Sequence, residues 1–278
     1  MKNEDIRTNV REGYGKIAVT GNSCCSLPIA GCCGGAQQAA AIGKAVGYSD
    51  EDLASVPEGA NLGLGCGNPV ALASLREGET VVDLGSGAGF DAFLASRQVG
   101  PTGRVIGVDM TPEMLDKARE NARKGGYENV AFRLGEIEHL PVAEGEADAI
   151  ISNCVINLSP DKQQVFREAF RVLKSGGRLM VSDIVLTKDL PEAIKASLTA
   201  WIGCVAGAAR KDDYLGAIAA AGFTDIEVVG QNVFPVDFLL NDPTVQTMVR
   251  DLGLSREALS DLAATAVSIR VSAVRPAR

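Results

Sequence analysis

The stretch Thr80-Val81-Val82-Asp83-Leu84-Gly85-Ser86-Gly87-Ala88-Gly89 decides the fold of this 278-residue chain. Its apolar first half predicts a buried strand, and its second half predicts a tight turn because three of its five residues are glycine. A helix is expected to follow over residues 90–98. A strand that runs through such a turn into a helix is typical of α/β folds that bind a nucleoside-bearing ligand over the turn.

The spacing of these glycines differs from the dinucleotide-binding fingerprint. That fingerprint, GxGxxG, needs glycine at its sixth position, where this chain has Phe90. The stretch Asp83–Gly89 has the form DxGxGxG instead. We therefore expect the loop to hold the amino-acid half of S-adenosylmethionine, which carries no pyrophosphate. A glycine turn without any ligand is the alternative that the loop alone leaves open.

Strands and helices alternate along the chain after residue 80. This alternation implies right-handed βαβ units and a mostly parallel sheet with helices on both faces, which is an α/β fold. Thr111 is expected to cap one helix that begins at Pro112, and Gly125-Gly126 to end it. The other strands are expected at residues 104–109, 130–134, 147–152, 177–181, 225–229 and 266–274, and the other helices from Ser159-Pro160 to Gly176-Gly177 and over 191–209 and 212–221.

The chain divides into three expected segments. Ser49 is a good helix N-cap in the first of them, because acidic residues follow it in the first turn. Residues 231–265 separate the last two strands and are expected to form a cap on one edge of the sheet. The segments are an N-terminal Cys-rich arm with helices near 4–14 and 36–46 (residues 1–60), the cofactor-binding domain (residues 61–185) and a C-terminal cap region that includes the last two strands (residues 186–278).

Charge and hydropathy exclude several classes of protein. The net charge of −8 argues against nucleic acid as a partner, because binding to phosphates depends on clustered Lys and Arg. No apolar run reaches the roughly 18 residues that a membrane span needs. The start of the chain, Met1–Asp5, lacks the apolar stretch of a secretory signal. We expect a cytoplasmic protein, and a monomer because no apolar stripe is left over for an interface.

Polar residues end several of the expected strands. Asp109 lies at the end of the second strand, 20 residues beyond Gly89, where a carboxylate can bind both ribose hydroxyls. A charge at the start of the next helix is the alternative for this residue. Glu136-Ile137 follows the third strand and is expected to face adenine, and Asn153 ends the fourth strand near the reacting centre. Ligands bind at this edge of open α/β sheets, so together these residues predict a cofactor site.

The seven cysteines form an unusual set. An odd number excludes a complete disulfide framework, and the sole histidine, His139, lies in a polar stretch that predicts a surface position. A His-rich zinc site is therefore excluded, and the absence of CxxC spacing weakens a zinc site made of cysteines. The cysteines are two adjacent pairs, Cys24-Cys25 and Cys32-Cys33, and three single residues, Cys66, Cys154 and Cys204.

One long motif makes the chain closely resemble the arsenite methyltransferase family. It is Ser-Asn-Cys-Val-Ile-Asn-Leu-Ser-Pro-Asp-Lys at residues 152–162, which is highly specific to this group. The resemblance covers most of residues 10–225. The other matching segments are Gly65-Cys66-Gly67, Asp83–Gly89, Asp109-Met110-Thr111, Ser175-Gly176-Gly177 with Ser182-Asp183, and Cys204 followed by Gly207. The chain departs from the family at Phe90, where some members have Arg, and lacks the longer extension that others carry after the seventh strand.

The resemblance implies a fold and a function. The fold is that of a class I methyltransferase, a Rossmann-like, mostly parallel seven-stranded sheet. The function is methyl transfer from S-adenosylmethionine to thiol-bound trivalent arsenic, which gives methylated arsenicals and detoxifies arsenite and methylarsenite. By the same resemblance, the cofactor contacts are expected at Asp83, Gly85, Gly87, Gly89, Asp109, Met110, Thr111, Glu136, Ile137, Asn153, Val155 and Leu158.

The resemblance also assigns the thiols. Cys154 and Cys204 are expected to bind arsenic(III) directly, and Cys66 to join them as a thiolate that binds arsenic or is oxidised during turnover. The family's N-terminal cysteine matches Cys24, and Cys25 is an equally placed neighbour. Lowered thiol pKa values would keep these ligands deprotonated. Glutathione or thioredoxin is the expected reductant, through disulfide exchange.

Two rival functions remain open from the sequence. The first is a methyltransferase for a small organic acceptor, in which Cys154 and Cys204 only pack in the core. The second is a thiol-rich sensor or buffer of soft metal ions, which the adjacent cysteine pairs suit and the cofactor loop does not. The pair Cys32-Cys33 has no assigned role: transit of arsenic, resolution of a disulfide and no function at all remain open.

Overall fold

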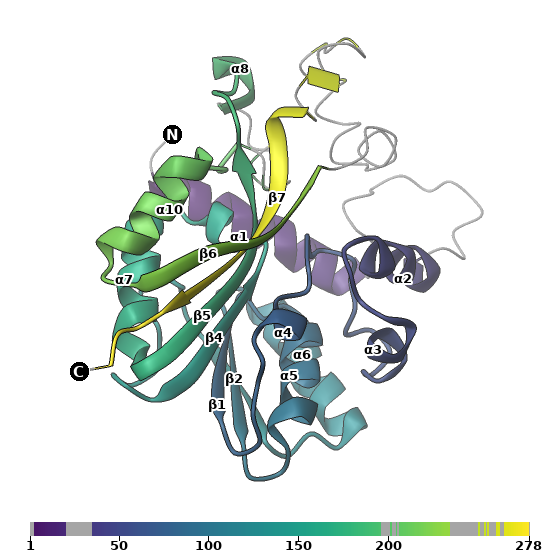
Figure 1. Ribbon diagram of the computed structural model, residues 1–278. Helices are drawn as coiled ribbons and strands as arrows, with labels where there is room; N and C mark the ends of the chain where they lie inside the picture. The colour runs from purple at the N-terminus through teal and green to yellow at the C-terminus, as the bar shows by residue number, and fades with distance from the viewer. Residues whose placement is uncertain are drawn as a thin grey trace.

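The computed structural model describes all seven strands of the sheet and most of the helices around it (Figure 1). Four of the seven cysteines, Cys24, Cys25, Cys32 and Cys33, lie outside the described residues, as does most of the expected cap. The described residues are 3–20, 35–195, 206–233 and 264–277, with the isolated positions 201, 204, 250, 253, 255, 260 and 261.

Seven strands form one sheet in the order β3-β2-β1-β4-β5-β7-β6. The first five strands pair in parallel, and β7 pairs antiparallel with both of its neighbours. The predicted mostly parallel, seven-stranded Rossmann-like sheet is therefore confirmed. The strands are β1 (Thr80–Leu84), β2 (Arg104–Asp109), β3 (Val130–Leu134), β4 (Ala147–Asn153), β5 (Leu173–Leu186), β6 (Thr224–Val233) and β7 (Ala266–Val274).

Helices cover both faces of the sheet. Figure 1 shows α7 and α10 on one side and α4, α5 and α6 on the other. The amino-terminal helix α1 lies across the edge at which the parallel strands end and packs against α6. The helices are α1 (Asn3–Thr20), α2 (Gly35–Ala45), α3 (Asp50–Ala54), α4 (Pro69–Leu72), α5 (Phe90–Val99), α6 (Pro112–Gly125), the short 3-10 helix η1 (Ile156–Leu158), α7 (Lys162–Val172), α8 (Glu192–Lys195) and α10 (Lys211–Ala220).

The core has one apolar layer on each face of the sheet. Val82 packs into the layer that contains Phe166 of α7, and Val81 packs into the layer that contains Ala95 of α5. Adjacent strand residues thus serve opposite layers, as the two-residue period of a strand requires. This is why β1 reads as a continuous apolar run. Each such side chain contributes about 1.5–3 kcal/mol when it is fully buried.

The chain reverses direction along the sheet between β1 and β4. From β1 it proceeds outward to β2 and β3, and it then returns to β4 on the other side of β1. The connections at the carboxyl ends of β1 and β4 therefore diverge, and a crevice opens between them. The glycine loop follows β1 and Cys154 follows β4, so both lie at this crevice.

The helix predicted from Ser159-Pro160 to Gly176-Gly177 was wrong at both ends. It begins at Lys162, where the Asp161 side chain accepts a hydrogen bond from the Gln164 N–H, so Asp161 is the cap. It ends at Val172, because the next residue is fully buried and pairs with Ala147 as the start of β5. The two glycines lie inside β5 instead, next to an irregularity in its register.

Other boundaries also differ from the prediction. Helix α1 continues to Thr20 and not to residue 14, and β6 extends to Val233, into the segment expected as a cap. Among the described residues of the helix expected over 191–209, Glu192–Lys195 and Trp201 are helical, and residues 204 and 206–209 are not. Ser49 caps α3 through a reciprocal capping box with Asp52, as predicted. The three-segment division and the cap stay predictions.

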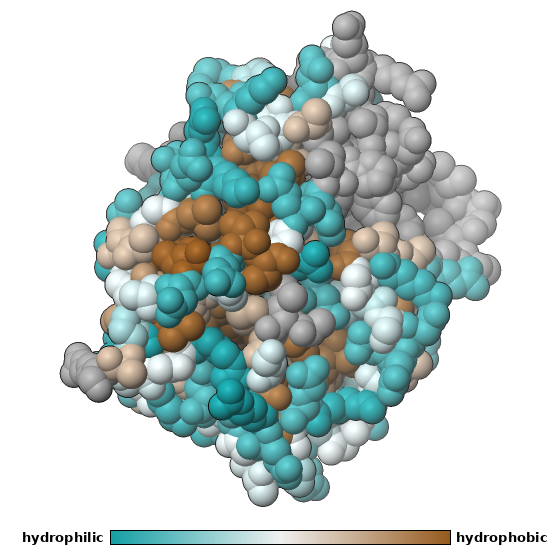
Figure 2. Space-filling model, in the orientation of Figure 1, coloured by the Kyte–Doolittle hydropathy of each residue, from teal (hydrophilic) through white to brown (hydrophobic). Residues whose placement is uncertain are grey.

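The outer edge of the sheet is partly apolar. Figure 2 shows hydrophobic side chains gathered over the region of β6, where Val228 and Val229 are 36% and 42% exposed. The expectation of a monomer rested on the absence of such a surface, and this premise does not hold at β6. Among the residues that the structure describes, no helix is both long and apolar enough to cross a membrane.

Candidate active site

The glycine loop between β1 and α5 lines a cavity. Gly85, Gly87 and Gly89 all have positive φ angles, of 67°, 51° and 96°. At Gly85 a side chain is excluded for a second reason, because its Cβ would overlap the Val155 side chain. The loop therefore presents bare backbone to the space above it, as the sequence predicts.

The cavity encloses about 1140 Å³ of empty space, which includes its open mouth. This is enough for a ligand of nucleoside size. Arg7, Val10 and Tyr14 of α1 close one side of it. Of the expected cofactor contacts, the cavity is lined by Asp83, Gly85, Gly87, Asp109, Met110, Thr111, Ile137, Asn153, Val155 and Leu158.

Two expected contacts lie outside this lining. Gly89 is the N-cap of α5, and its backbone N–H donates to the Ser86 carbonyl. The Glu136 carboxylate lies 3.6 Å from Arg7 Nε and borders a neighbouring surface groove. The buried neighbour Glu138 lines the cavity in its place and accepts a hydrogen bond of 2.6 Å from the Ser159 hydroxyl.

Asp109 connects the glycine loop to the start of α6. One carboxylate oxygen accepts from the Gly87 N–H at 2.9 Å and the other from the Thr111 N–H at 2.8 Å. Burial raises the pKa of Asp109, and these hydrogen bonds oppose that rise. The Thr111 hydroxyl and the Met110 N–H also hydrogen-bond this carboxylate. Its place in the cavity wall, at the end of β2, is that of a carboxylate that binds ribose hydroxyls.

Asp83 carries an unsatisfied oxygen at the cavity. The side chain is 2% exposed, and its Oδ2 has no hydrogen-bond partner among the described residues. Burial, and then the charges of Asp91 and Asp109, raise the pKa of Asp83 well above its usual value. A buried carboxylate oxygen without a donor is costly. A ligand that brings a cationic donor, such as the ammonium group of S-adenosylmethionine, therefore fits this site.

Asn153 holds the loop that carries Cys66. Its Oδ1 accepts a hydrogen bond from the Cys66 N–H at 3.0 Å. Its Nδ2 lies 2.8 Å from the Tyr48 hydroxyl, 2.8 Å from the Gly67 carbonyl and 3.0 Å from Asp91 Oδ2, three acceptors for two protons. The residue lines the cavity as predicted, but its polar atoms already bind protein groups.

The sequence did not predict the partners of Asn153. Tyr48 donates to Asp91 Oδ1 at 2.5 Å, and both side chains are buried. Burial raises the pKa of Asp91 to about 6, although its hydrogen bonds with Tyr48 and Asn153 lower it. No local sequence signal marks these residues, because the network joins positions 48, 66, 91 and 153 across the chain.

The three single cysteines meet beside the cavity. Cys66, Cys154 and Cys204 are 5%, 6% and 5% exposed, and none of them is in a disulfide. The Cys204 thiol donates to the Cys154 carbonyl at 3.2 Å, and Cys66 Sγ lies 3.9 Å from the Ser182 hydroxyl. Cys154 also lines the cofactor cavity, so the thiol cluster adjoins it.

The backbone at two of these cysteines is strained. Cys154 and Cys204 have φ angles of 58° and 59°, in the left-handed region that residues other than glycine rarely adopt. Such conformations cost of order 1–3 kcal/mol and concentrate at functional sites. The sequence placed Cys204 on a helix, and this was wrong: it lies in a turn, which directs its thiol toward Cys154.

Close packing fixes the Cys66 loop on β5 and β7. Gly67 has no room for a side chain, because its Cβ would overlap the Ser182 hydroxyl. The Cys66 carbonyl accepts a hydrogen bond of 2.8 Å from the Ser268 hydroxyl of β7. The loop is thereby held at both of its peptide groups, by Asn153 at the N–H and by Ser268 at the carbonyl.

The expected lowering of the thiol pKa values was wrong for Cys66 and Cys154. Burial raises the pKa of Cys66. The neighbouring thiols of Cys204 and Cys66, followed by burial, raise the pKa of Cys154 well above its usual value. Thiolates are disfavoured in this apolar pocket, whose other walls include Ile184, Leu190 and further buried aliphatic residues. Cys66 and Cys154 are therefore neutral thiols near neutral pH.

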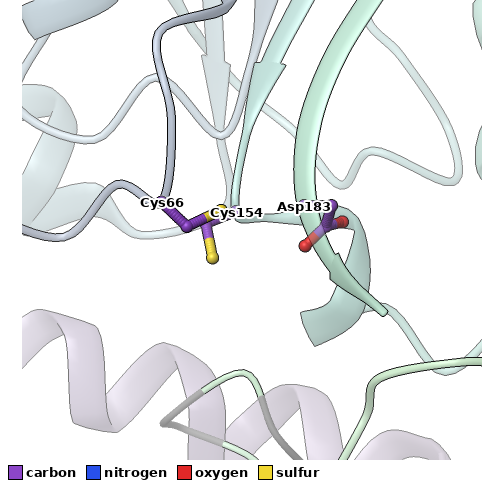
Figure 3. A group of neighbouring side chains, drawn as sticks. All are labelled: Cys66, Cys154 and Asp183. Atoms are coloured by element: carbon purple, nitrogen blue, oxygen red, sulfur yellow. The ribbon is translucent and has the colours of Figure 1, made fainter. Parts of the chain in front are cut away.

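A carboxylate completes the cluster. Figure 3 shows Asp183, on β5, beside Cys66 and Cys154, and one oxygen of Asp183 and the two sulfur atoms lie within 4.8 Å of one another. Burial raises the pKa of Asp183 to about 7. The nearest buried cation is Lys162, which donates to the Ser159 carbonyl at 2.9 Å and whose pKa burial lowers to about 8. The sequence assigned no role to either residue.

Comparisons with known proteins agree with this geometry. Residues 75–222 match the methyltransferase domain family. The arsenite methyltransferase of Halobacterium salinarum is 52% identical over 81% of this chain and 59% of its own length, and that of Homo sapiens is 38% identical over 62% and 48%. The chain thus spans about half to three fifths of these curated relatives.

One solved structure is related over more of its length. The arsenic(III) S-adenosylmethionine methyltransferase from Chlamydomonas reinhardtii is 32% identical, with a TM-score of 0.60 over 84% of this chain and 73% of that chain. The glycine loop, the strand order and the three converging cysteines agree with the resemblance that the sequence indicated. The chain belongs to the family of arsenic(III) S-adenosylmethionine methyltransferases.

Proposed function

We propose that this chain transfers methyl groups from S-adenosylmethionine to trivalent arsenic held by Cys66, Cys154 and Cys204. The observation that carries the proposal is the meeting of three buried thiols beside a cavity with a bare glycine loop. The names of the relatives in Halobacterium salinarum and Chlamydomonas reinhardtii support it.

The cofactor would be held by two carboxylates of the cavity wall. Asp109 would accept from the ribose hydroxyls, and the unpaired Asp83 oxygen would accept from the ammonium group. Ile137 and Met110 supply apolar contacts in the cavity wall. When bound, the cofactor supplies an electrophilic methyl group on a sulfonium centre.

Neutral thiols suit arsenite as a substrate. Arsenite is an uncharged trihydroxide in neutral water, so it can enter an apolar pocket at little cost. Each thiol can replace one hydroxyl: an arsenic–sulfur bond forms, the arsenic–oxygen bond breaks, and the thiol proton leaves with the hydroxyl as water. No free thiolate and no net charge are needed, which reconciles the raised pKa values of Cys66 and Cys154 with binding.

The protein then contributes to the reaction by positioning the bound arsenic relative to the methyl group. Soft thiolate ligands leave trivalent arsenic with a lone pair, which is the nucleophile. Asn153 and Gly67 fix Cys66, and the strained backbone fixes Cys154 at the cavity wall. Holding nucleophile and methyl group in line can lower the barrier by up to about 7–11 kcal/mol.

The proposed reaction also needs a source of electrons, which involves the remaining cysteines. Methyl transfer oxidises trivalent arsenic, so two electrons must return from thiols before a trivalent product leaves. Glutathione or thioredoxin would supply them through disulfide exchange that involves Cys66 and Cys24 or Cys25. Methylarsenite would be a second substrate, in a cytoplasmic enzyme.

The test is incubation of the full chain with arsenite, glutathione and methyl-labelled S-adenosylmethionine, followed by speciation of arsenic. We expect label on arsenic, and a loss of at least 100-fold, about 2.7 kcal/mol, in Cys154→Ser and Cys204→Ser. Glu120→Gln, at an exposed site on α6, is the control. Absence of labelled arsenic, or label on a quinone-type acceptor with Cys154→Ser fully active, would reject the proposal.

A further inference from the structure

The thiol cluster contains one ligand group more than trivalent arsenic requires. Arsenic(III) binds three thiolates and keeps its fourth position for the lone pair. Cys66, Cys154 and Cys204 supply those three thiolates under the proposed function. The Asp183 oxygen nevertheless lies within 4.8 Å of the Cys66 and Cys154 sulfur atoms (Figure 3).

We propose that Cys66, Cys154, Cys204 and Asp183 together form a four-ligand site for a thiophilic divalent cation, of the Zn²⁺ and Cd²⁺ class, whose binding excludes arsenite. These ions favour four ligands in a tetrahedron, with thiolate sulfur and carboxylate oxygen among the usual donors. In this site the cation would occupy the space that arsenic occupies during turnover.

The spacing of the ligand atoms fits such an ion. A tetrahedron with metal–sulfur bonds of about 2.3 Å has edges of about 3.8 Å. The Cys66, Cys154 and Asp183 ligand atoms all lie within 4.8 Å of one another, so they need to approach by about 1 Å or less. Cys204 is not within this distance of all three atoms. Its thiol donates to the Cys154 carbonyl at 3.2 Å, so its side chain must turn from that carbonyl toward the cation to become the fourth ligand.

The carboxylate is held in place by its own partners. The Ile184 N–H donates to Asp183 Oδ1 at 2.9 Å, and the Tyr214 hydroxyl and the Asn157 N–H donate to Oδ2 at 3.2 Å each. Hydrogen bonds of this kind orient metal ligands and raise metal affinity. Asp183 is 1% exposed, so it faces the thiols without competition from bulk water.

Charge also favours a cation over a neutral ligand at the fourth position. Three thiolates and a carboxylate carry four negative charges, which a divalent cation and the buried Lys162 ammonium together reduce to one. The thiol protons pass to the buffer when the cation binds. Arsenite offers no charge for Asp183 to neutralise, so its affinity should be nearly independent of this carboxylate.

The test is a Cd²⁺ titration of the full chain in which Cys24, Cys25, Cys32 and Cys33 are replaced by Ser. This background removes the other cysteines, and thiolate-to-cadmium charge-transfer absorbance reports binding. We expect one Cd²⁺ per chain, displacement of Cd²⁺ by arsenite, and at least a tenfold weaker Cd²⁺ affinity in Asp183→Asn. Arsenite affinity in Asp183→Asn should change less than about threefold.

Tyr214→Phe is the matched control, because it removes one hydrogen bond to Asp183 and keeps the carboxylate. It should weaken Cd²⁺ binding less than Asp183→Asn does, and the melting temperature of each variant checks the fold. If Asp183→Asn does not fold, two other measurements still test the site: the displacement of Cd²⁺ by arsenite, and the loss of both Cd²⁺ binding and arsenite binding in Cys204→Ser.

Three results would overturn the proposal: equal Cd²⁺ affinity with and without the Asp183 carboxylate, equal losses of Cd²⁺ and arsenite affinity in Asp183→Asn, or simultaneous binding of Cd²⁺ and arsenite. The inference extends the thiol site of the proposed function. The Cd²⁺ measurement needs no S-adenosylmethionine, so intact Cd²⁺ binding without arsenic methylation would reject the proposed function alone.

Discussion

The side-chain oxygen of Asn153 accepts a hydrogen bond from the backbone N–H of Cys66, 3.0 Å away. The two residues are 87 positions apart, and Asn153 is followed directly by Cys154. One amide thus connects the loop of the first thiol to the strand end that carries the second. The spacing of the two thiols depends on this contact.

Replacement of Asn153 by Asp should therefore weaken arsenite binding. The variant keeps an acceptor for the Cys66 N–H, but it loses the donors to Tyr48 and Gly67 and places a second carboxylate beside Asp91. We expect a loss of about 1–3 kcal/mol in the free energy of unfolding and at least a tenfold loss of arsenite affinity. Urea unfolding and calorimetric titration measure the two quantities.

Asn129→Asp is the matched control for this variant. Asn129 donates to the Gly100 carbonyl at 2.9 Å in a site away from the thiols, so its loss should lower stability but spare arsenite affinity. If the two variants bind arsenite equally well at equal stability, Asn153 does not position Cys66.

Much of the cofactor site could be predicted from sequence because it depends on local geometry. The glycine loop and Asp109 follow from short-range patterns of glycine, apolar and acidic residues, and both are observed at the cavity, although Gly89 and Glu136 lie outside its lining. The same holds for the cap of α3 at Ser49, which needs contacts over only three residues.

The remainder of the site depends on long-range packing. Asp183 lies on β5 beside the thiols because this strand continues to Leu186 and does not end at residue 181 as predicted. Burial under residues of α1 and β5 raises the pKa of Cys66, and the neighbouring thiols, followed by burial, raise the pKa of Cys154; a sequence does not reveal this packing. The partners of Asn153 come from three separate segments for the same reason.

Replacement of Asp109 by Asn should weaken cofactor binding. The variant keeps one acceptor oxygen, but its NH₂ group must face either the Gly87 or the Thr111 N–H. Loss of a charge-assisted acceptor costs about 1.5–3 kcal/mol, so we expect at least a tenfold rise in the Kd for S-adenosylmethionine, measured calorimetrically without arsenite. Asp116→Asn, exposed on α6, should leave the Kd unchanged, and an equal effect of both would contradict the assignment.

The free energy of unfolding should decrease as the pH rises, because Asp91 loses its proton. Its pKa is about 6 in the folded protein against an ordinary value of 3.8, so the native state binds more protons between these values than the unfolded state. The stability that the protonated form contributes is present below about pH 4 and is lost as the pH rises through about 6. Urea unfolding of wild type and Asp91→Asn should show a difference that changes across this window and is flat above it. A difference that is constant with pH would exclude a raised Asp91 pKa.

Arg7 should control the docking of α1 over the cavity. Its guanidinium lies 3.3 Å from Glu138, a carboxylate that is 3% exposed, and removal of a buried charge's partner is costly. We expect Arg7→Gln to lower the stability of α1 by about 1–3 kcal/mol and to speed hydrogen exchange over Asn3–Thr20. Arg11→Gln, exposed on the same helix, should leave exchange unchanged. Equal exchange in the two variants would show that the ion pair does not hold the helix.

A steric test of the Cys66 loop is available at Gly67. A Cβ there would overlap the Ser182 hydroxyl, so Gly67→Ala must push the loop away from β5 and separate Cys66 from Cys154. We expect at least a tenfold loss of arsenite affinity with little change in the Kd for S-adenosylmethionine, because Gly67 does not line the cofactor cavity. A second change, Ser182→Gly, removes the overlapping atoms and should restore most of the lost affinity. The single Ser182→Gly variant is the control, and recovery of affinity in the double variant would separate the position of the loop from a general loss of stability. If the double variant does not recover arsenite binding, the contact between Gly67 and Ser182 does not set the spacing of the thiols.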